Sequence, residues 1–376
     1  MISFLQSAFY FILLISVVVF IHEYGHYYFA KKYKVTVTDF SIGFGKELFG
    51  WFDKDGTRWK VCLIPLGGYV KFFGDSNAAS KPSKPSEVNS KDHHKLLANK
   101  PLYQRAIIVA AGPIANFILA IFIFSLIFMI KGKDSSIPII QEVQKESPAA
   151  SAGLKAGDQI SFINGTKIES INEVSALINM PGADDIIQLE VTRNSKLLKF
   201  EIIPIIKSGT DSLGNKSQRK MIGIKIAPLN NKMDRQQLGP AKAIYYAFKE
   251  TYKTITLTLS YLGNVIGGSA SPDQLGGPIK IAQITGQVAD YGFFPFLSIM
   301  AYISISLGLI NLFPIPLLDG GHLFFYLIEF ARGKPLSEKI QEYFYRFGFF
   351  LLFTLMFCKQ QKEPKSIKIF LYFFTK

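Results

Sequence analysis

The chain has 376 residues, a formal net charge of +14 and only two cysteines, Cys62 and Cys358. Hydrophobic residues make up 49% of it and 34 residues are phenylalanine, which favours a membrane protein over a soluble one. Two cysteines exclude a disulfide framework and a cysteine zinc cluster. We attribute the positive charge to the orientation of membrane spans and expect no nucleic-acid partner.

Four segments are apolar enough to cross a bilayer as helices. Residues 2–21 and 106–130 contain no Lys, Arg, Asp or Glu, so each can face lipid with its backbone hydrogen bonds satisfied internally. A third candidate covers residues 293–312, and a shorter fourth covers residues 344–358. No basic residue precedes the first segment and no small-residue cleavage site follows it, so we expect a retained helix rather than a signal peptide. The predicted fold class is a polytopic α-helical membrane protein.

The first apolar segment ends in a motif that is typical of metal-dependent hydrolases. Residues 22–26 read His-Glu-Tyr-Gly-His. On a helix, residues four apart point in nearly the same direction, so the imidazoles of His22 and His26 can reach one metal ion. Glu23 points about 100° away and can act as a general base on a water molecule. A chance match is the competing interpretation, but three such side chains in a lipid-embedded helix are costly unless they are partnered.

The loop between the first two spans is basic and predicts the orientation of the chain. From Lys31 to Arg105 there are 14 Lys or Arg residues against seven Asp or Glu residues. The positive-inside rule therefore places this loop in the cytoplasm and the region after the second span outside. Apolar alternation over residues 61–69, with Gly67 and Gly68, predicts a strand and turn whose edge could accept an extended substrate.

Two histidines leave a catalytic zinc ion short of a third protein ligand. His93 and His94 lie in a polar loop where solvated side chains are expected. Asp319 and His322 follow two prolines at the end of the third span, where irregular backbone is tolerated if it lines a cavity. Asp319 is also a good cap for the next helix. The spacing alone leaves the choice between these two residues open.

Together these motifs resemble the site-2 protease family of intramembrane zinc metalloproteases, in particular its bacterial branch typified by the regulator of sigma-E protease. The resemblance covers residues 1–357. It rests on the His-Glu-x-x-His motif, on Gly-Phe-Gly at 43–45, on the run that ends in Gly67, Gly68 and Tyr69, on Gly-Pro-Ile-Ala-Asn at 112–116, and on Leu-Asp-Gly at 318–320.

The resemblance implies a Zn²⁺ cofactor held by His22, His26 and Asp319, with Glu23 as the catalytic base. It assigns Asn311 to binding of the substrate backbone, although a helix-packing hydrogen bond is the alternative. It places Gly67, Gly68 and Tyr69 in a membrane-associated β-rich loop that contacts substrate. For Gly112 and Asn116, close helix packing is favoured over direct catalysis. The implied location is a bacterial inner membrane.

The middle of the chain is soluble in character and resembles a PDZ domain. Its signature is Pro-Ala-Ala-Ser-Ala-Gly-Leu-Lys-Ala-Gly-Asp at 148–158, followed by strand patterns at 186–191 and 198–203. A PDZ domain binds a peptide end as an added strand, and a steric gate that binds no peptide is the alternative. The region has room for one such domain, whereas relatives of the sigma-E branch usually carry two.

These observations predict four regions in chain order. Residues 1–136 form the catalytic membrane region, 137–228 a single exterior PDZ domain, 229–292 a linker with an interfacial amphipathic helix at 245–262, and 293–376 the second membrane region. After Cys358 a charged run interrupts the fourth span, which we interpret as a frameshifted or eroded end, with a genuine lineage-specific tail as the alternative.

The predicted function is zinc-dependent endopeptidase cleavage of transmembrane segments in single-span membrane proteins, with the lipid bilayer and a peptide ligand as further partners. Two alternatives stand against it. One is a catalytically inactive membrane adaptor that uses the PDZ domain, which retention of Glu23 and the ligand residues argues against. The other is a metal transporter, which would need a continuous polar pathway that the second span does not offer.

Overall fold

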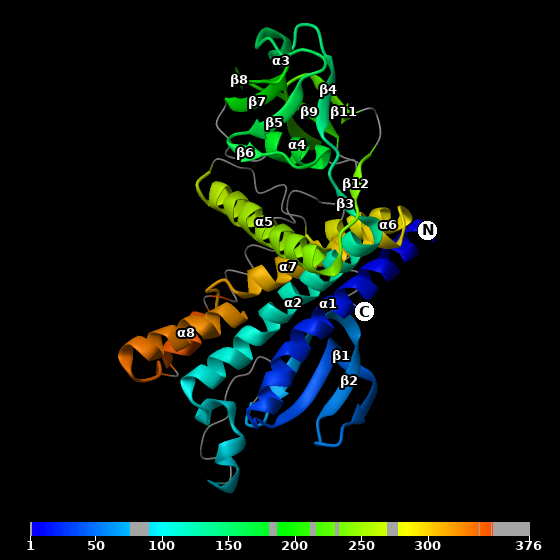
Figure 1. Ribbon diagram of the computed structural model, residues 1–376. Coiled ribbons are helices and arrows are strands. Elements are labelled where there is room, and N and C mark those ends of the chain that lie inside the picture. Colours follow the sequence, from blue (N-terminus) through cyan, green and yellow to red (C-terminus); the bar gives the residue numbers. More distant parts are fainter. Residues whose placement is uncertain are drawn as a thin grey trace. The chain divides into compact units, whose positions relative to one another are not determined.

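The computed structural model describes residues 2–75, 90–179, 186–210, 216–229, 233–268, 277–337, 339–346 and 348 (Figure 1). The chain divides into two compact units. The first comprises residues 1–123 and 276–376, and the second comprises residues 124–275.

Three long helices in the described residues are apolar enough to cross a membrane: α1 (Ile2–Lys32), α2 (Leu102–Lys131) and α7 (Phe293–Asn311). They confirm the first three predicted spans as helices. Each exceeds about 17 residues, the minimum for a hydrocarbon core of about 30 Å. The predicted fourth span, residues 344–358, lies largely outside the described residues.

Small residues let the helices of the first unit approach closely. Gly25 of α1 faces the carbonyl group of Ala111 on α2, and any larger side chain at Gly25 would overlap it. Gly308 of α7 packs against α2, with the position of a Cβ atom 3.0 Å from the Pro113 carbonyl oxygen. Helix α6 (Pro278–Asp290) lies against the start of α1, where Gly286 meets Ser7. Such contacts are typical of helices that associate in lipid.

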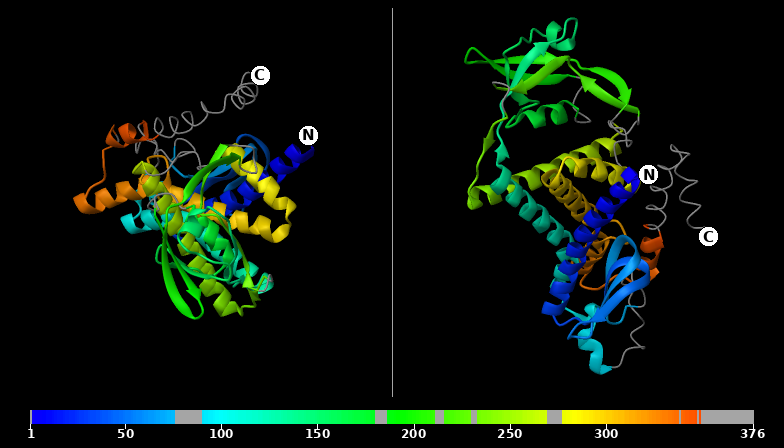
Figure 2. Two further views of the ribbon diagram at one scale, coloured as in Figure 1. Left: turned by 90° about the horizontal axis from the view of Figure 1, so that it is seen from above. Right: turned by 90° about the vertical axis from the view of Figure 1, so that its right-hand side faces the viewer.

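The loop after α1 forms a β-hairpin that lies beside that helix in both figures (Figures 1 and 2). Strand β1 (Val37–Phe52) pairs antiparallel with β2 (Arg58–Phe72), which confirms the strand predicted over residues 61–69. Both strands bend, so residues 39–42 pair with residues 58–61 on one side and with residues 68–71 on the other. Segment 68–72 is consequently an edge of the sheet, on the side of α1.

This hairpin combines a buried aromatic cluster with many exposed apolar side chains. The end next to α1 is buried around Phe40, which stacks on Trp59 with ring centroids 4.1 Å apart. The hairpin also exposes large apolar side chains, namely Phe44, Leu48, Phe49, Trp51, Phe52, Leu63 and Ile64. Large apolar side chains exposed in such number favour contact with protein or membrane.

The second unit contains a domain built on a sheet with the strand order β11-β4-β5-β7-β8. Its main core consists of alternate residues from these strands, such as Ile160, Leu189 and Val191, and of the inner face of helix α4. The strands are β4 (Pro138–Val143), β5 (Gln159–Ile163), β7 (Ile187–Arg193), β8 (Lys196–Ile202) and β11 (Ile224–Pro228), and the helices are α3 (Pro148–Ser151) and α4 (Ile171–Ile178).

Smaller elements complete the described chain. Two short strands, β3 (Lys133–Asp134) and β12 (Arg235–Gln236), pair with each other where the chain enters and leaves this domain. The others are β6 (Thr166–Lys167), the hairpin of β9 (Ile205–Thr210) and β10 (Lys216–Met221), and the 3₁₀ helices η2 (Ser90–Lys95) and η3 (Leu97–Asn99).

Helix α5 (Pro240–Ile266) covers the segment predicted to form an amphipathic helix. It is tied to the domain in the second unit by ion pairs. Lys249 pairs with Glu169, and Lys253 pairs with Glu173 in the first turn of α4. Lys133 reaches the same Glu169 carboxylate at 2.6 Å, so this carboxylate joins α5 to strand β3.

Candidate metal centre

The site lies on the inner face of α1, where His22 and His26 occupy successive turns. Both side chains are buried, with 7% and 9% of their surface exposed, and their Nε2 atoms are 3.2 Å apart. The helix contains no proline and runs unbroken through the motif. The four-residue spacing therefore places both rings on one side, as the sequence predicts.

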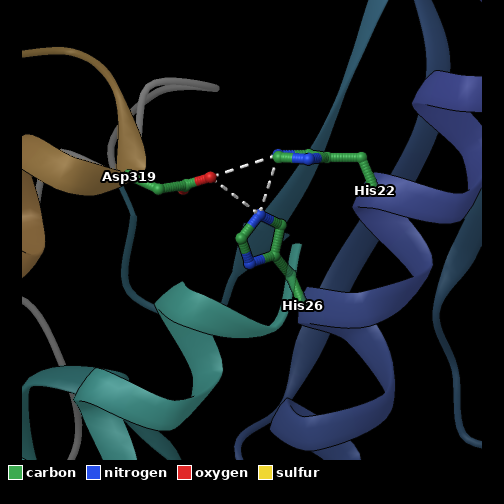
Figure 3. A group of neighbouring side chains, drawn as sticks. All are labelled: His22, His26 and Asp319. Carbon is green, nitrogen blue, oxygen red and sulfur yellow. Dashed lines mark hydrogen bonds and ion pairs between the residues drawn. The ribbon is translucent and has the colours of Figure 1, made fainter. Parts of the chain in front are cut away.

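The third side chain comes from the other end of the chain. Asp319 is the first residue of helix α8 (Asp319–Arg332). Its Oδ2 atom lies 3.1 Å from His22 Nε2 and 3.5 Å from His26 Nε2. Figure 3 shows the three side chains pointing toward one another, the histidines from α1 and the aspartate from the start of α8.

A tight turn carries the chain from the end of α7 to Asp319. Leu317 adopts a left-handed conformation with φ of 82°, after the two prolines of this segment. Gly320 and Gly321 then pass against the carbonyl groups of Leu312 and Ile315, where a Cβ atom would overlap the backbone. Glycines are needed here for close approach, not for a special dihedral angle. The turn thus places a carboxylate beside the face of α1 that carries the two histidines.

The donor atoms of this cluster fit zinc. Two imidazole nitrogens and one carboxylate oxygen are the three-ligand set of many catalytic zinc sites, which keep a fourth position open. The donor atoms of His22, His26 and Asp319 all lie within 4.8 Å of one another. Asp319 Oδ2 is buried and, among the described residues, accepts no regular hydrogen bond. A buried oxygen that faces two imidazole nitrogens is suited to a cation.

Helix α2 contacts both histidine rings at their Nδ1 atoms. His26 Nδ1 lies 2.9 Å from the carbonyl oxygen of Ile108, and His22 Nδ1 lies 3.1 Å from the side-chain nitrogen of Asn116. Between them, Gly112 leaves the space that the two rings occupy, because a Cβ atom there would overlap His26 Nε2. Sequence reasoning missed the Ile108 carbonyl, since a backbone acceptor has no sequence signal.

Glu23 is half-buried on the adjacent face of α1 and lies next to strand β2. The position of a Cβ atom on Gly68 would be 3.0 Å from Glu23 Cγ and 2.8 Å from Val19 Cγ1. The edge segment 68–72 therefore runs directly past the predicted base. Tyr69, the next residue, stacks on Phe44 with ring centroids 6.1 Å apart. Gly67 also meets that ring, since a Cβ atom there would overlap Phe44.

The structure also places the remaining candidates. Asn311, the last residue of α7, has its side-chain nitrogen 3.5 Å from His22 Nε2. His322 lies one turn into α8 and contacts the Tyr345 hydroxyl at 3.5 Å, outside the group of three. His93 and His94 lie on the 3₁₀ helix η2 and are also outside it.

Fold and site together define a class of protein: a helical protein with helices of membrane-spanning length and a buried centre of two histidines and one aspartate. Comparison with known proteins leads to the same class of protein. The model of Peptidase family M50 matches residues 10–355. A protein of Agrobacterium fabrum named "Putative zinc metalloprotease" is 43% identical over 92% of each chain. One of the same description from Rickettsia conorii is 39% identical over 95% of this chain and 98% of its own.

Protease RseP of Yersinia pestis is 32% identical over 95% of this chain and 98% of its own length. The chain belongs to Peptidase family M50, the site-2 protease family, which confirms the resemblance drawn from its motifs. Among solved structures, the PDZ domain of an SdrC-like protein from Listeria monocytogenes matches 26% of this chain and 93% of its own, with 24% identity and a TM-score of 0.19.

Proposed function

We propose that this protein is an intramembrane zinc endopeptidase that cleaves transmembrane segments of single-span membrane proteins. The observation that carries the proposal is that His22 and His26, on the apolar helix α1, meet Asp319 at the start of α8, with their donor atoms within 4.8 Å of one another. In a membrane, such polar side chains are costly unless they serve a site. The relatives named as zinc metalloproteases support zinc as the metal.

In the proposed mechanism the chain supplies metal ligands, a general base and groups that bind the substrate backbone. His22, His26 and Asp319 would hold the zinc ion, which when bound supplies Lewis acidity and makes a water molecule a stronger acid. Glu23 accepts the proton from the attacking water and delivers it to the leaving amine. Asn311, 3.5 Å from His22 Nε2, is close enough to hold the substrate backbone beside the metal ligands.

A transmembrane substrate must lose its helical hydrogen bonds before its carbonyl groups can be attacked. We propose that segment 68–72 accepts the unwound substrate as an added strand. This segment pairs with β1 on one side only, among the described residues, and Gly68 lies beside Glu23. Added strands gain main-chain hydrogen bonds, which makes binding tolerant of sequence. The exposed apolar side chains of the hairpin would enter the lipid interface.

We further propose that residues 137–228 form a PDZ domain that binds peptide ends between β11 and α4. Strand β11 is one of the two edge strands of the sheet, and α4 contacts it. The preceding Gly223 adopts φ of 81°, and the Lys220 backbone N–H donates to Asn179 at the end of α4 at 2.9 Å. If the domain is instead a steric gate, no peptide should bind at this edge in binding experiments.

The proposed location is a bacterial inner membrane, with the loop from Lys31 to Arg105 in the cytoplasm and the PDZ domain outside. The charge count of that loop supports this orientation. We retain the four regions predicted from the sequence, including residues 229–292 as a linker whose α5 would lie at the membrane interface.

The test is a cleavage reaction in detergent with a panel of tagged single-span proteins, followed by mass spectrometry of the products. The proposal predicts one new carboxyl terminus inside or beside the apolar segment, and none with Glu23→Gln. Cleavage only in soluble loops would contradict intramembrane action. Binding of the panel without any cleavage, at full zinc occupancy, would favour the adaptor.

A further inference from the structure

Asn116 is a buried amide whose role in the site is not explained by helix packing. It lies on α2, none of its surface is exposed, and its Nδ2 atom is 3.1 Å from His22 Nδ1. Its Oδ1 atom is buried and, among the described residues, has no hydrogen-bond partner. A buried amide oxygen without a donor is destabilising, so a donor is expected nearby.

The chemistry of His22 identifies that donor. Its Nε2 atom faces Asp319 and His26, and it can bind a metal ion only through an unprotonated lone pair. A neutral imidazole then carries its single proton on Nδ1. The Nδ1–H group points at the Asn116 amide and needs an acceptor there, whereas an amide nitrogen can only donate.

A half-turn of the Asn116 amide satisfies this requirement. The nitrogen and oxygen ends of an amide have nearly the same size, so the half-turn keeps the shape of the side chain. It places Oδ1 where Nδ2 now lies, 3.1 Å from His22 Nδ1. The orphaned oxygen then accepts the imidazole proton, and His22 is held with Nε2 free toward the metal.

The other histidine is held by the same helix in the same manner. His26 Nδ1 lies 2.9 Å from the Ile108 carbonyl oxygen, which accepts its proton. Ile108, Gly112 and Asn116 follow each other at four-residue intervals, so they form one stripe of α2 facing α1. Only the partner of His22 is a side chain, and only it can be removed by substitution.

Helix α7 fixes Asn116 in turn. Ser304 Oγ donates to the Asn116 backbone carbonyl oxygen at 2.8 Å, and a Cβ atom on Gly308 would lie 3.2 Å from Asn116 Cβ. These contacts hold the backbone and Cβ and leave the amide for His22. We propose that Asn116 is a positioning residue that fixes the His22 tautomer and ring for zinc binding. The inference rests on the zinc site proposed above.

The test measures zinc affinity of the purified full-length protein in detergent by competition with a chelator, together with the visible spectrum of the Co²⁺-substituted protein. Asn116→Leu keeps the size but removes the acceptor, and should weaken zinc binding about 10–100-fold and change the Co²⁺ bands. Asn116→Asp keeps an acceptor and should bind zinc within about threefold of wild type, as carboxylate partners of zinc-bound histidines do. Gln104→Leu removes an amide at the start of the same helix, where its side-chain nitrogen donates to the Tyr103 hydroxyl at 3.0 Å; it is the matched control and should bind zinc as wild type.

The outcomes separate this inference from the proposed function. Wild-type affinity in Asn116→Leu would overturn the positioning role and leave the zinc site intact. Zinc binding by Asn116→Asp that is at least about tenfold weaker than wild type would also overturn it, and this comparison with wild type holds even if the leucine variant does not fold. A wild-type protein that binds no zinc would overturn the zinc site itself, and the inference with it.

Discussion

Arg105 and Glu329 form a two-point ion pair that ties the start of α2 to α8. The guanidinium nitrogens Nη1 and Nη2 lie 3.0 Å and 2.5 Å from the two carboxylate oxygens, and both side chains are largely buried. The Arg105 guanidinium also lies over the Tyr326 ring, 5.0 Å from its centroid. Because α8 begins at Asp319, this pair anchors the helix that presents the carboxylate to the two histidines.

We expect Arg105→Leu to lower both thermal stability and zinc affinity. Breaking the pair leaves the Glu329 carboxylate partly buried without its partner, at a cost of about 2 kcal/mol once its partial exposure is considered. The thermal midpoint in detergent and a zinc competition titration measure the two effects. Arg346→Leu removes an exposed pair with Glu342 and should change neither quantity. Equal midpoints for the two variants would argue against the anchoring role.

Gly112→Ala should abolish stable zinc binding. The new methyl group would overlap His26 Nε2 and come within 2.9 Å of His22 Nε2, so both rings must leave their positions. Zinc content per chain after gel filtration gives the readout, and we expect it to fall at least about tenfold, as for other losses of ligand geometry. Gly263→Ala on α5, where a Cβ atom meets nothing within 4 Å, is the control. Normal zinc content in Gly112→Ala would contradict the placement of the rings.

The contact between α5 and α4 should loosen in acid. Partial burial opposes ionisation of Glu169, but Lys133 and Lys249 outweigh it and lower the Glu169 pKa to about 2, below its ordinary value of 4.5. A depressed carboxyl pKa contributes stability that is complete above pH 4.5 and lost as pH falls toward 2. Spin labels at Tyr252 and Ile203, in a background without Cys62 and Cys358, would report a broader distance distribution at pH 3 than at pH 7.

Glu169→Gln is the control for this pH response. It removes the titrating group, so the distribution should already be broad at pH 7 and should change less with acid. An equally narrow distribution at both pH values in the unsubstituted protein would show that the ion pairs do not hold α5 in place.

Arg193→Leu should destabilise the domain in the second unit, because it leaves the buried Asp158 carboxylate without its charged partner. The Asp158 carboxylate is almost fully buried and receives Arg193 Nε at 2.6 Å and the Lys155 backbone N–H at 2.9 Å. Burial opposes ionisation of Asp158, but these donors lower its pKa below the ordinary value. Limited proteolysis of this domain under increasing urea measures the loss. The double variant with Asp158→Asn should regain part of the lost stability, because it leaves no unpaired buried charge. A double variant less stable than Arg193→Leu would exclude this account.

Much of the site could be predicted from local sequence. The helix rule places His22 and His26 on one face from their spacing alone, and the alternation over residues 61–69 predicts β2. The choice between Asp319 and His322 could not be made in this way. It depends on how the turn after α7 folds back, and only the family resemblance indicated Asp319 before the structure brought it to the histidines.

Other features lie beyond local patterns because they depend on contacts between distant segments. Residues 39–42 pair with two parts of β2 because both strands bend. The alternation of apolar and polar residues does not predict these bends. The Ile108 carbonyl is a backbone group that any residue could provide. Asn116 was expected to pack helices, and its contact with His22 depends on the angle at which α2 crosses α1. The charges of Arg105 and Glu329 give no hint in the sequence that they meet.

The most direct test of the central claim compares zinc content and cleavage in the same preparations of wild type, Glu23→Gln and Asp319→Asn. The account predicts that Glu23→Gln retains one zinc ion per chain and cleaves nothing, because it removes the base and keeps the ligands. Asp319→Asn should lose both zinc and cleavage. Cleavage by Glu23→Gln at the wild-type rate, or by wild-type protein stripped of zinc, would contradict it.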